Sequence, residues 1–596
     1  MNRKNFWLFA ASMLLGALVV TACSDSNDNT GGGSDPASPV ATDIVVMYYA
    51  MGGSNLDYDN ETDLVLAANE IATRSRNVRY FAQVKYSAQK GYDKTQQETK
   101  MEDATWKYKM SGDYGCVYRW EVTADRVTKQ SYNANSQIDL GHSGVGAFTF
   151  TADEKVGDAS YKMYDPKNLA DFIRYCMDKT PEAKAYALVI GDHGGAWLPQ
   201  DDADKSTLPT KNASRRGILY DDNLNNANMS SQEIVTALKS LSAAQLQKIM
   251  LIDYDCCLMS NLETLGELIV DGKPLVPYVM GSSHSMPVGN QGTFCAYLSK
   301  AAQNGTVTQQ AFAMQASAIP AALIEEKRKE FIKEGMKSDT YRNLDYTVTD
   351  MSKLPAAYAA IKQVTDFLVK QDVSGTAAAA EYNAAASKCY QFSNNFPFYD
   401  VVDYFNTLQS EVFPESDEFA TLVSNATKAI RACMLGHADY SYSLDVVNGS
   451  TKTLPGGGLT YSIIIGTNAS AFKYKNNSEF TSDKGVIMTY IKGKYDEQQF
   501  LNALLLSNGN AYMSLYKKTD EHFNYNTVTH KSQESIGTPV SWDNTYKKTT
   551  FDKATGWSRW MLKNPGIPQG NPPLGDDDDR IGYQDLLEEY YRDMFE

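Results

Sequence analysis

The sequence predicts an α/β fold built around a mostly parallel sheet. Between residues 43 and about 300, short apolar runs alternate with longer segments whose apolar residues have helical spacing, which is typical of alternating strands and helices. The runs are nearly continuous in hydrophobicity, as strands are when helices cover both faces of a parallel sheet. We expect strands at 43–50, 79–86, 116–122, 185–191, 248–254 and 277–282, and helices at 59–74, 166–178, 230–240 and 260–269.

Residues 301–470 are predicted to continue this core as a largely helical insertion. Apolar periodicity indicates helices at 308–336, 354–370 and 377–386, followed by strands around 440–448 and 458–466. The last hundred or so residues are rich in Tyr, Lys and Asn with weak strand alternation. We therefore expect a smaller C-terminal domain over 471–596, with a tail helix at 585–595.

The N-terminus has the pattern of an export signal. Arg3 and Lys4 precede an apolar run from Phe6 to Val20, and Ala22 and Cys23 follow, which predicts a signal peptide over residues 1–22. A Cys at this place resembles a bacterial lipobox, so Cys23 is the candidate for lipidation. The alternatives are an ordinary cleavable signal or a transmembrane anchor, but the run is shorter than the ~20 residues that a spanning helix needs.

The segment 23–42 is mostly Ser, Asp, Asn, Gly and Pro, a composition typical of a flexible tether. A lipid on Cys23 followed by this tether predicts a protein anchored in the cell envelope, at the outer membrane or cell surface. The formal net charge of −16 argues against nucleic acid as a partner, because phosphate binding needs clustered Lys and Arg. The same acidic charge favours cationic substrates.

Two predicted strands lead directly into residues that carry chemistry. His193 follows the run 185–191, and Cys257 follows the run 248–254. Chemistry in open α/β sheets collects at the carboxyl ends of the strands. A thiol and an imidazole that meet there are the minimum equipment of a cysteine hydrolase.

The two segments resemble the clostripain family of cysteine peptidases, which shares a structural clan with caspases, legumain and gingipains. The segments that carry the resemblance are 190–197 (IGDHGGAW) and 253–259 (DYDCCLM), and the similarity covers most of residues 43 to about 470. It implies a caspase-like α/β/α sandwich, with peptide or protein substrates.

The resemblance implies a catalytic dyad of His193 as base and Cys257 as nucleophile. In the family motif the nucleophile directly precedes Leu-Met, which selects Cys257 over Cys256. Successive side chains at a strand end point to opposite faces, so only one of the two thiols is expected in the cleft. Oxyanion donors are expected from the backbone N–H groups of Gly194 and Cys257.

The resemblance also implies that Asp255 lines the pocket for the residue before the cut and selects Arg, then Lys. A turn or helix-capping carboxylate is the plainer interpretation of the same residue. Where the family often has a second acid, this chain has His284. We expect His284 either in the pocket wall, among the substrate-binding residues, or as an ordinary loop histidine.

Clostripain-like zymogens cut themselves between the His and the Cys. The polar segment 200–216 lies there and is at least a solvated loop; its candidate cleavage sites are Lys205, Lys211, Arg215 and Arg216.

Some members depend on calcium, for which Asp221, Asp222 and residues 57–61 offer oxygens. The sequence holds no twelve-residue calcium loop and suggests no other metal site. We expect no required cofactor and keep calcium as a candidate. The alternative function is a catalytically silent surface-binding or adhesion lipoprotein on the same fold. Such a protein would usually have lost the His or the Cys, and both are present.

Overall fold

The structure is a computed structural model. The described residues are 42–52, 56–86, 115–124, 152–197, 217–221, 224, 227–286, 290–303, 305–334, 343–373, 376–392, 398–441, 454–465, 514–515, 546–564 and 581–582. The expected signal peptide, the tether, Cys23 and the segment 200–216 lie outside these ranges. Within these ranges, no helix is both long enough and apolar enough to cross a bilayer.

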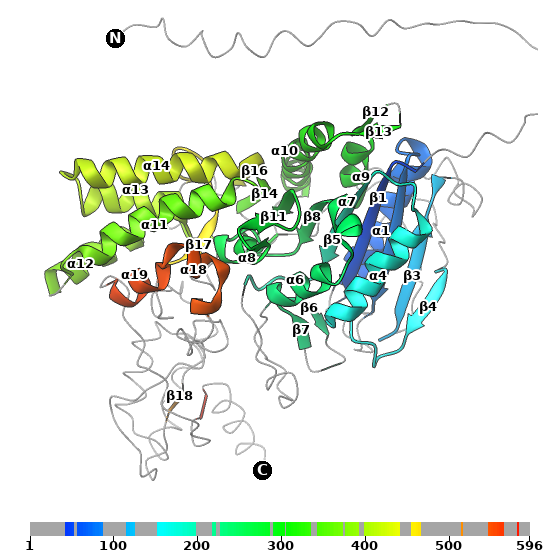
Figure 1. The fold of residues 1–596 in the computed structure, drawn as a ribbon, viewed down its shortest axis with the longest axis horizontal. Helices are drawn as coiled ribbons and strands as arrows, with labels where there is room; N and C mark the ends of the chain where they lie inside the picture. Colours follow the sequence, from blue (N-terminus) through cyan, green and yellow to red (C-terminus); the bar gives the residue numbers. More distant parts are fainter. Residues whose placement is uncertain are drawn as a thin grey trace, which may run out of the picture. The chain divides into compact units, whose positions relative to one another are not determined.

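A nine-stranded sheet lies at the centre of the described chain (Figure 1). Across the sheet the strands are β16 (Met434–Ser441), β14 (Asn343–Asp350), β11 (Tyr278–Gly281), β8 (Ile249–Asp255), β5 (Ala185–Gly191), β1 (Ile44–Met51), β2 (Val78–Lys85), β3 (Val117–Val122) and β4 (Glu154–Gly157). The central strands β11, β8, β5, β1 and β2 pair in parallel, while β14 and β16 at one edge and β3 and β4 at the other pair antiparallel. The sheet is therefore mixed but mostly parallel, as predicted.

Helices cover both faces of this sheet, so the fold is an α/β/α sandwich. Along β1, Val45, Met47 and Tyr49 pack into one buried cluster, whereas Val46 and Tyr48 pack into another; this alternation is the period of a strand buried on both faces. The first face is covered by α4 (Pro166–Lys179), α6 (Ser231–Lys239), α8 (Leu262–Glu267) and α11 (Leu354–Lys370), and the second by α1 (Asp57–Thr73), α9 (Gln291–Ser299) and α10 (Gln309–Glu334).

Further helices pack beside α11, at the left of Figure 1. They are α12 (Thr376–Lys388), α13 (Val401–Glu411), α14 (Asp417–Cys433), α18 (Thr550–Thr555) and α19 (Trp557–Lys563). The remaining short elements are α7 (Ala243–Lys248), a 3-10 turn (Tyr546–Lys548), and the strand pairs β6 (Ile218–Asp221) with β7 (Ala227–Met229), β9 (Ile269–Val270) with β10 (Lys273–Pro274), β12 (Ala302–Gln303) with β13 (Thr306–Val307), β15 (Phe398–Asp400) with β17 (Ser462–Ile464), and β18 (Ser514–Leu515) with β19 (Ile581–Gly582).

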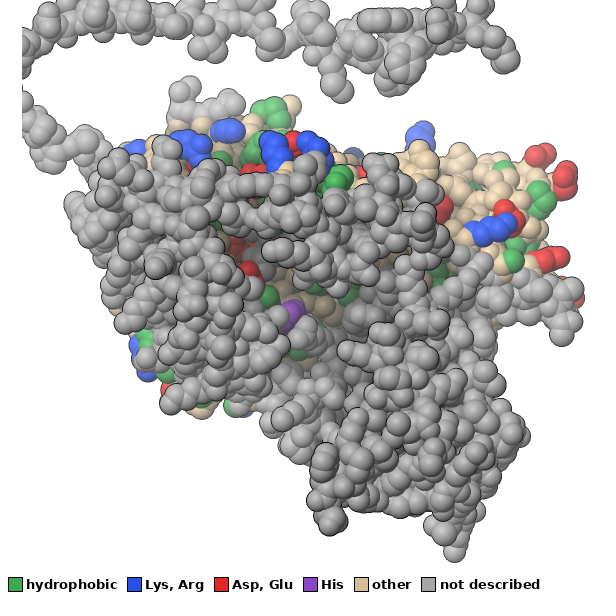
Figure 2. Space-filling model, turned by 180° about the vertical axis from the view of Figure 1, so that it is seen from behind, with side chains coloured by type: hydrophobic (Ala, Val, Ile, Leu, Met, Phe, Trp, Pro, Cys, Tyr) green, Lys and Arg blue, Asp and Glu red, His purple; other side chains and the backbone are tan. Residues whose placement is uncertain are grey.

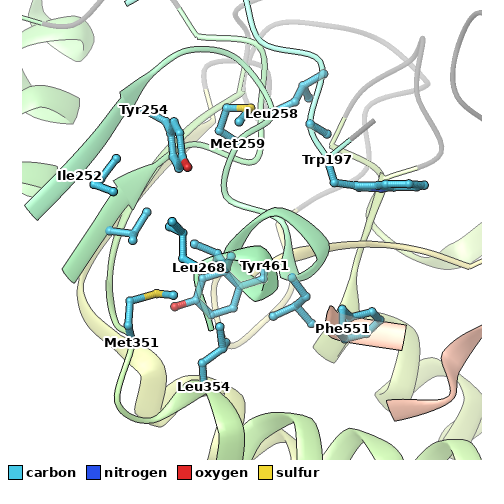
Figure 3. Packing of buried hydrophobic residues seen from close by; sticks show 14 of the residues in the cluster. Trp197, Ile252, Tyr254, Leu258, Met259, Leu268, Met351, Leu354, Tyr461 and Phe551 are labelled. Atoms are coloured by element: carbon cyan, nitrogen blue, oxygen red, sulfur yellow. The ribbon is translucent and has the colours of Figure 1, made fainter. Parts of the chain in front are cut away.

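The described C-terminal segment 546–564 packs into the core, while most of the C-terminal domain expected over 471–596 lies outside the described residues. Phe551, Trp557 and Trp560 are buried in the cluster that lies under α8 and α11, and Figure 3 shows Phe551 packed near Tyr461 and Leu268. The indole of Trp557 donates to the carbonyl of Ile464 at 2.6 Å. The described C-terminal residues therefore share one buried cluster with α8 and α11.

The predicted strands and helices up to residue 388 match the structure within two residues at each end. Two later predictions need correction. The strand expected at 440–448 is β16, which begins at Met434; residues 442–448 lie outside the described part. The strand expected at 458–466 is the three-residue β17, and it pairs with β15 instead of joining the central sheet.

Candidate active site

The two predicted catalytic residues follow neighbouring strands. β5 and β8 pair in parallel, and their register places Gly191 opposite Asp255. His193 and Cys257 each come two residues after these partners, at the same edge of the sheet, and both are partly exposed. The structure therefore brings the imidazole-bearing loop and the thiol-bearing loop together, as the strand pattern predicted.

Gly194 shows how closely the two loops approach. A Cβ atom added to Gly194 would lie 1.9 Å from the carbonyl oxygen of Cys257 and 2.9 Å from its backbone nitrogen. No side chain fits there, so the backbones on either side of the site are in direct contact only because residue 194 is glycine. This places the backbone amides of Gly194 and Cys257 close to each other.

The Cys257 sulfur has backbone contacts that suit a nucleophile. The N–H of Met286 donates to Sγ at 3.3 Å, and the carbonyl oxygen of Met286 lies 3.6 Å from it. The two contacts fix the position of the sulfur against the backbone of Met286. Cys256, by contrast, is buried with its Sγ 3.2 Å from the carbonyl of Ile190, and burial raises the pKa of its thiol well above 9.0. Cys256 therefore remains a packed thiol on the opposite side.

Asp192 holds the loop of His193 through the backbone. Its carboxylate accepts from the N–H of His193 at 2.6 Å and from the N–H of Tyr220 in β6. The N–H of Gly195 donates to the carbonyl of Gly217 at 2.8 Å. The segment 217–221 is thus hydrogen-bonded to the histidine loop on both sides of His193, at Asp192 and at Gly195.

Backbone strain is concentrated around this site. Ala196, Leu219 and Leu258 adopt left-handed conformations with φ of 64°, 59° and 65°, which cost about 1–3 kcal/mol for each non-glycine residue. Ala196 follows His193 in the chain, Leu219 lies in β6, and Leu258 directly follows Cys257. Strain of this kind persists where the surrounding packing fixes a functional geometry.

His284 does not line a pocket in this structure. Its side chain is 3 % exposed; Nδ1 lies 2.6 Å from Oδ1 of Asp345 and Nε2 lies 2.8 Å from the hydroxyl of Tyr390. Neither ring nitrogen is left for a substrate, so the expectation that His284 binds substrate needs correction. Its carbonyl accepts from the N–H of Leu258 at 3.0 Å, and His284 therefore holds the loop that follows Cys257.

Asp255 lies at the end of β8 on the face covered by α1 and α9. It is 7 % exposed, and the amide nitrogen of Gln291 donates to its Oδ2 at 3.4 Å. Asp253 lies two residues earlier in the same strand, and Asp63 of α1 is close enough for its pKa to be raised by the charge of Asp255, after burial as the main cause. A carboxylate in this position can meet a cationic side chain.

The described residues offer no group of three or more His, Cys, Asp or Glu able to hold a metal ion. Asp221, one of the candidate calcium ligands, instead pairs with Lys85 at 2.6 Å, and both side chains are fully buried. Residues 57–61 form the first turns of α1. Asp222 and the four candidate cleavage sites, Lys205, Lys211, Arg215 and Arg216, lie outside the described part of the chain.

Sequence reasoning did not find three features of the site: the donor Met286, the neighbouring acid Asp63, and the edge-to-face contact between Trp197 and Tyr546, whose ring centroids are 5.0 Å apart. The first two depend on contacts between segments far apart in the chain. Trp197 lies in the segment 190–197 that carries the resemblance, so its place near His193 could be predicted from the sequence. Its contact with Tyr546 could not.

An α/β/α sandwich with a thiol and an imidazole on adjoining loops, at the carboxyl edge of parallel strands, defines the class of cysteine hydrolases. The family model of the clostripain family matches residues 149–561, well over half of the chain. The protein therefore belongs to the clostripain family, whose members are cysteine peptidases. The match extends past residue 470, where the resemblance was expected to end, and includes the segment 546–561.

Solved structures with a similar fold include C11 cysteine proteases from Bacteroides and Parabacteroides. One is a secreted C11 cysteine protease from Bacteroides thetaiotaomicron called iotapain, with 15 % identity, 71 % of this chain and 94 % of that chain covered, and a TM-score of 0.43. Another is an inactive zymogen C11 protease from Parabacteroides distasonis, with 14 % identity, 72 % and 93 % coverage, and a TM-score of 0.40. No curated protein sequence matches the chain. We transfer no residue role from these similarities.

Proposed function

We propose that this protein is an exported cysteine endopeptidase that hydrolyses peptide bonds after Arg, and less well after Lys, through His193 and Cys257. The observation that carries the proposal is the contact of Gly194 with the backbone of Cys257, which joins the two loops at one edge of the sheet. Membership in the clostripain family supports the same chemistry. Asp255, buried beside the nucleophile loop, is the proposed acceptor for the basic side chain.

In the proposed mechanism, His193 accepts the proton of the Cys257 thiol, and the sulfur attacks the carbonyl carbon of the scissile bond. The N–H groups of Gly194 and Cys257 donate to the resulting oxyanion. His193 then protonates the leaving amine as the C–N bond breaks, which leaves a thioester on Cys257. Water hydrolyses the thioester and restores the thiol. No step needs a cofactor, and a comparison of rates in Ca²⁺ and in chelator tests the candidate role of calcium.

The proposal is tested by alkylation of the purified full-length chain with iodoacetamide, alongside hydrolysis of a fluorogenic Arg peptide. Of the seven cysteines in the described ranges, six are buried and Cys257 alone is partly exposed. We expect Cys257 to react first, with loss of hydrolysis at the same rate. Slow, uniform labelling without turnover, before and after nicking by trypsin, would support the surface-binding alternative instead.

We also propose that the chain processes itself within 200–216, after Lys205, Lys211, Arg215 or Arg216. Support comes from the segment 217–221, which directly follows 200–216 in the chain and is hydrogen-bonded to the histidine loop. Intact mass should show two fragments for the wild type and one chain for Cys257→Ala. Splitting of the inactive variant would assign the cut to another protease.

The proposed location is the cell envelope, through a lipid on Cys23 and the tether 23–42. Support is the basic and apolar pattern that precedes Cys23. We expect the mature protein to partition into detergent and Cys23→Ser to partition into water. Equal partitioning of the two proteins would contradict a lipid anchor on Cys23. On the face drawn in Figure 2, basic and acidic side chains of the described residues lie close to one another along the upper edge.

A further inference from the structure

The face of the sheet that carries Asp255 holds a buried group of acceptors. Asp63 of α1, Asp253 and Asp255 of β8 and Gln291 of α9 meet there, and they are 1 %, 2 %, 7 % and 1 % exposed. The backbone N–H of Gln291 donates to Oδ1 of Asp63 at 3.3 Å, and the side-chain nitrogen of Gln291 donates to Oδ2 of Asp255 at 3.4 Å. Gln291 therefore links a carboxylate of the first helix to the carboxylate beside the nucleophile.

Three oxygens in this group are buried without a hydrogen-bond donor: Oδ2 of Asp63, Oδ1 of Asp253 and Oε1 of Gln291. The Gln291 oxygen belongs to the side-chain amide whose nitrogen donates to Asp255. It is therefore a neutral acceptor that lies next to the carboxylates. A buried acceptor without a donor is costly. Three together indicate a place built for a ligand that brings several N–H donors.

The charge of the group indicates that this ligand is a cation. Burial, and then the charge of Asp255, raises the pKa of Asp63 well above 3.8; burial and Asp255 do the same for Asp253. Two or three carboxylates this close cannot all ionise without a positive partner. A metal is not the indicated partner, because the described residues provide no set that could hold a metal ion. A guanidinium has five donors and an ammonium three.

The group lies next to the nucleophile. Burial and then the charges of Asp255, Asp253, Asp63 and Cys257 raise the pKa of Tyr346, so its hydroxyl lies within electrostatic range of both the acids and the thiol. Met286, which donates to the Cys257 sulfur, packs in the same buried cluster as Tyr346. Asp255 also precedes Cys257 by two residues, so a side chain bound beside Cys257 lies close to this group.

We propose that Asp63 is a second specificity-determining acid of the pocket for the residue before the cut, and that it binds a substrate guanidinium together with Asp255 while Gln291 accepts from the same group. The inference rests on the proposed peptidase function and deepens it. It assigns to an acid of α1 the role that the loop with His284 does not fill. The carboxylates approach from two elements, which suits the planar fork of Arg better than the point charge of Lys.

The test compares two fluorogenic peptides that differ only in carrying Arg or its neutral isostere citrulline before the cut. Asp63→Asn keeps an oxygen for the Gln291 N–H but removes the charge. We expect kcat/KM for the Arg peptide to fall by about 10- to 100-fold, as for one lost charge-assisted hydrogen bond. The rate with citrulline should stay within about twofold, and inhibition by benzamidine should weaken in parallel.

Asp400→Asn is the matched control, because Asp400 is a fully buried carboxylate at the start of α13, on the other face of the sheet. It should leave the ratio of Arg to citrulline rates unchanged. If Asp63→Asn unfolds, Gln291→Leu replaces it and should also lower that ratio.

Folded variants that keep the wild-type ratio overturn the role of Asp63 but leave the peptidase standing. A wild type that hydrolyses the Arg and citrulline peptides equally also overturns the role of Asp63. A wild type with neither turnover nor selective Cys257 alkylation instead refutes the proposed function.

Discussion

Cys256 and Cys257 are neighbours in the chain, yet they differ in the properties that decide the reactivity of a thiol. Cys256 is 5 % exposed and packs against the carbonyl of Ile190, where burial disfavours the thiolate. Cys257 is partly exposed and accepts a backbone N–H. Reactivity follows the thiolate and its accessibility, so this contrast supports the proposal of Cys257, and not Cys256, as the nucleophile.

This contrast predicts opposite outcomes for two alanine variants. Cys257→Ala should lower kcat/KM by more than about 10³-fold, because the nucleophile is lost. Cys256→Ala should keep kcat/KM within about threefold and lower the free energy of unfolding by about 1 kcal/mol, because only a small buried group is removed. Peptide hydrolysis and urea unfolding measure the two effects. An inactive but fully folded Cys256→Ala would reverse the assignment.

The positions of His193 and Cys257 could be predicted because each follows a continuous apolar run, and the carboxyl ends of parallel strands share one edge. Their catalytic roles remain proposals. The partners of the site could not be predicted, because Asp63 and Gln291 meet across more than two hundred residues and no periodic pattern marks such a contact. The same holds for the donor at Met286, which lies in a loop.

At the scale of elements, the segments predicted from apolar periodicity up to residue 388 are present, but the prediction missed β4 and β14 in the central sheet and the helices α7 and α9. The residues of β14 are NLDYTVTD, and Asp345, Thr347 and Thr349 are buried. Buried polar side chains are tolerated where they have partners: Asp345 binds the loop at 282–284, and the hydroxyl of Thr349 lies 3.0 Å from that of Tyr461. These partners come from other elements, so the strand looks too polar when it is considered alone.

Asp345 connects β14 to the loop that carries Met286. Its carboxylate accepts from the hydroxyl of Ser282, from the N–H groups of Ser283 and His284 at 3.1 Å, and lies 2.6 Å from the ring of His284. We expect Asp345→Asn to lower the free energy of unfolding by about 3 kcal/mol, because hydrogen bonds to a charged group are lost. We also expect kcat/KM to fall by about tenfold as the loop shifts. Thermal unfolding and peptide hydrolysis measure both.

Asp350→Asn is the control on the same strand. Asp350 is partly exposed and accepts from the N–H and hydroxyl of Ser352, so its loss should cost less than about 1 kcal/mol and leave kcat/KM unchanged. Equal effects of the two substitutions would mean that the loop at 282–286 does not depend on Asp345.

At the scale of the whole molecule, the C-terminal segment closes over the helix that follows the nucleophile. The carboxylate of Glu263 in α8 accepts from the hydroxyl of Tyr546 at 2.9 Å, and Glu267 accepts from the N–H of Thr550 at 3.0 Å. The expectation of a C-terminal domain over 471–596 rests on a change in composition, and composition alone does not reveal that the aromatic residues of 546–564 pack into the core. The family match to residue 561 is consistent with this packing.

The buried carboxyl of Glu263 makes this packing depend on pH. Burial raises its pKa from 4.5 to about 7, so between these values the folded state binds more protons than the unfolded state, and the free energy of unfolding falls as the pH rises. This contribution is fully present below about pH 4.5 and is lost as the pH passes through about 7, by about 3 kcal/mol in all.

Glu263→Gln keeps an acceptor for Tyr546 but cannot titrate. Urea unfolding from pH 4.5 to 8 should therefore show the wild type losing about 3 kcal/mol relative to the variant. Parallel curves for the two proteins would mean that Glu263 is already ionised in the fold, and that the C-terminal segment is held by its aromatic residues alone.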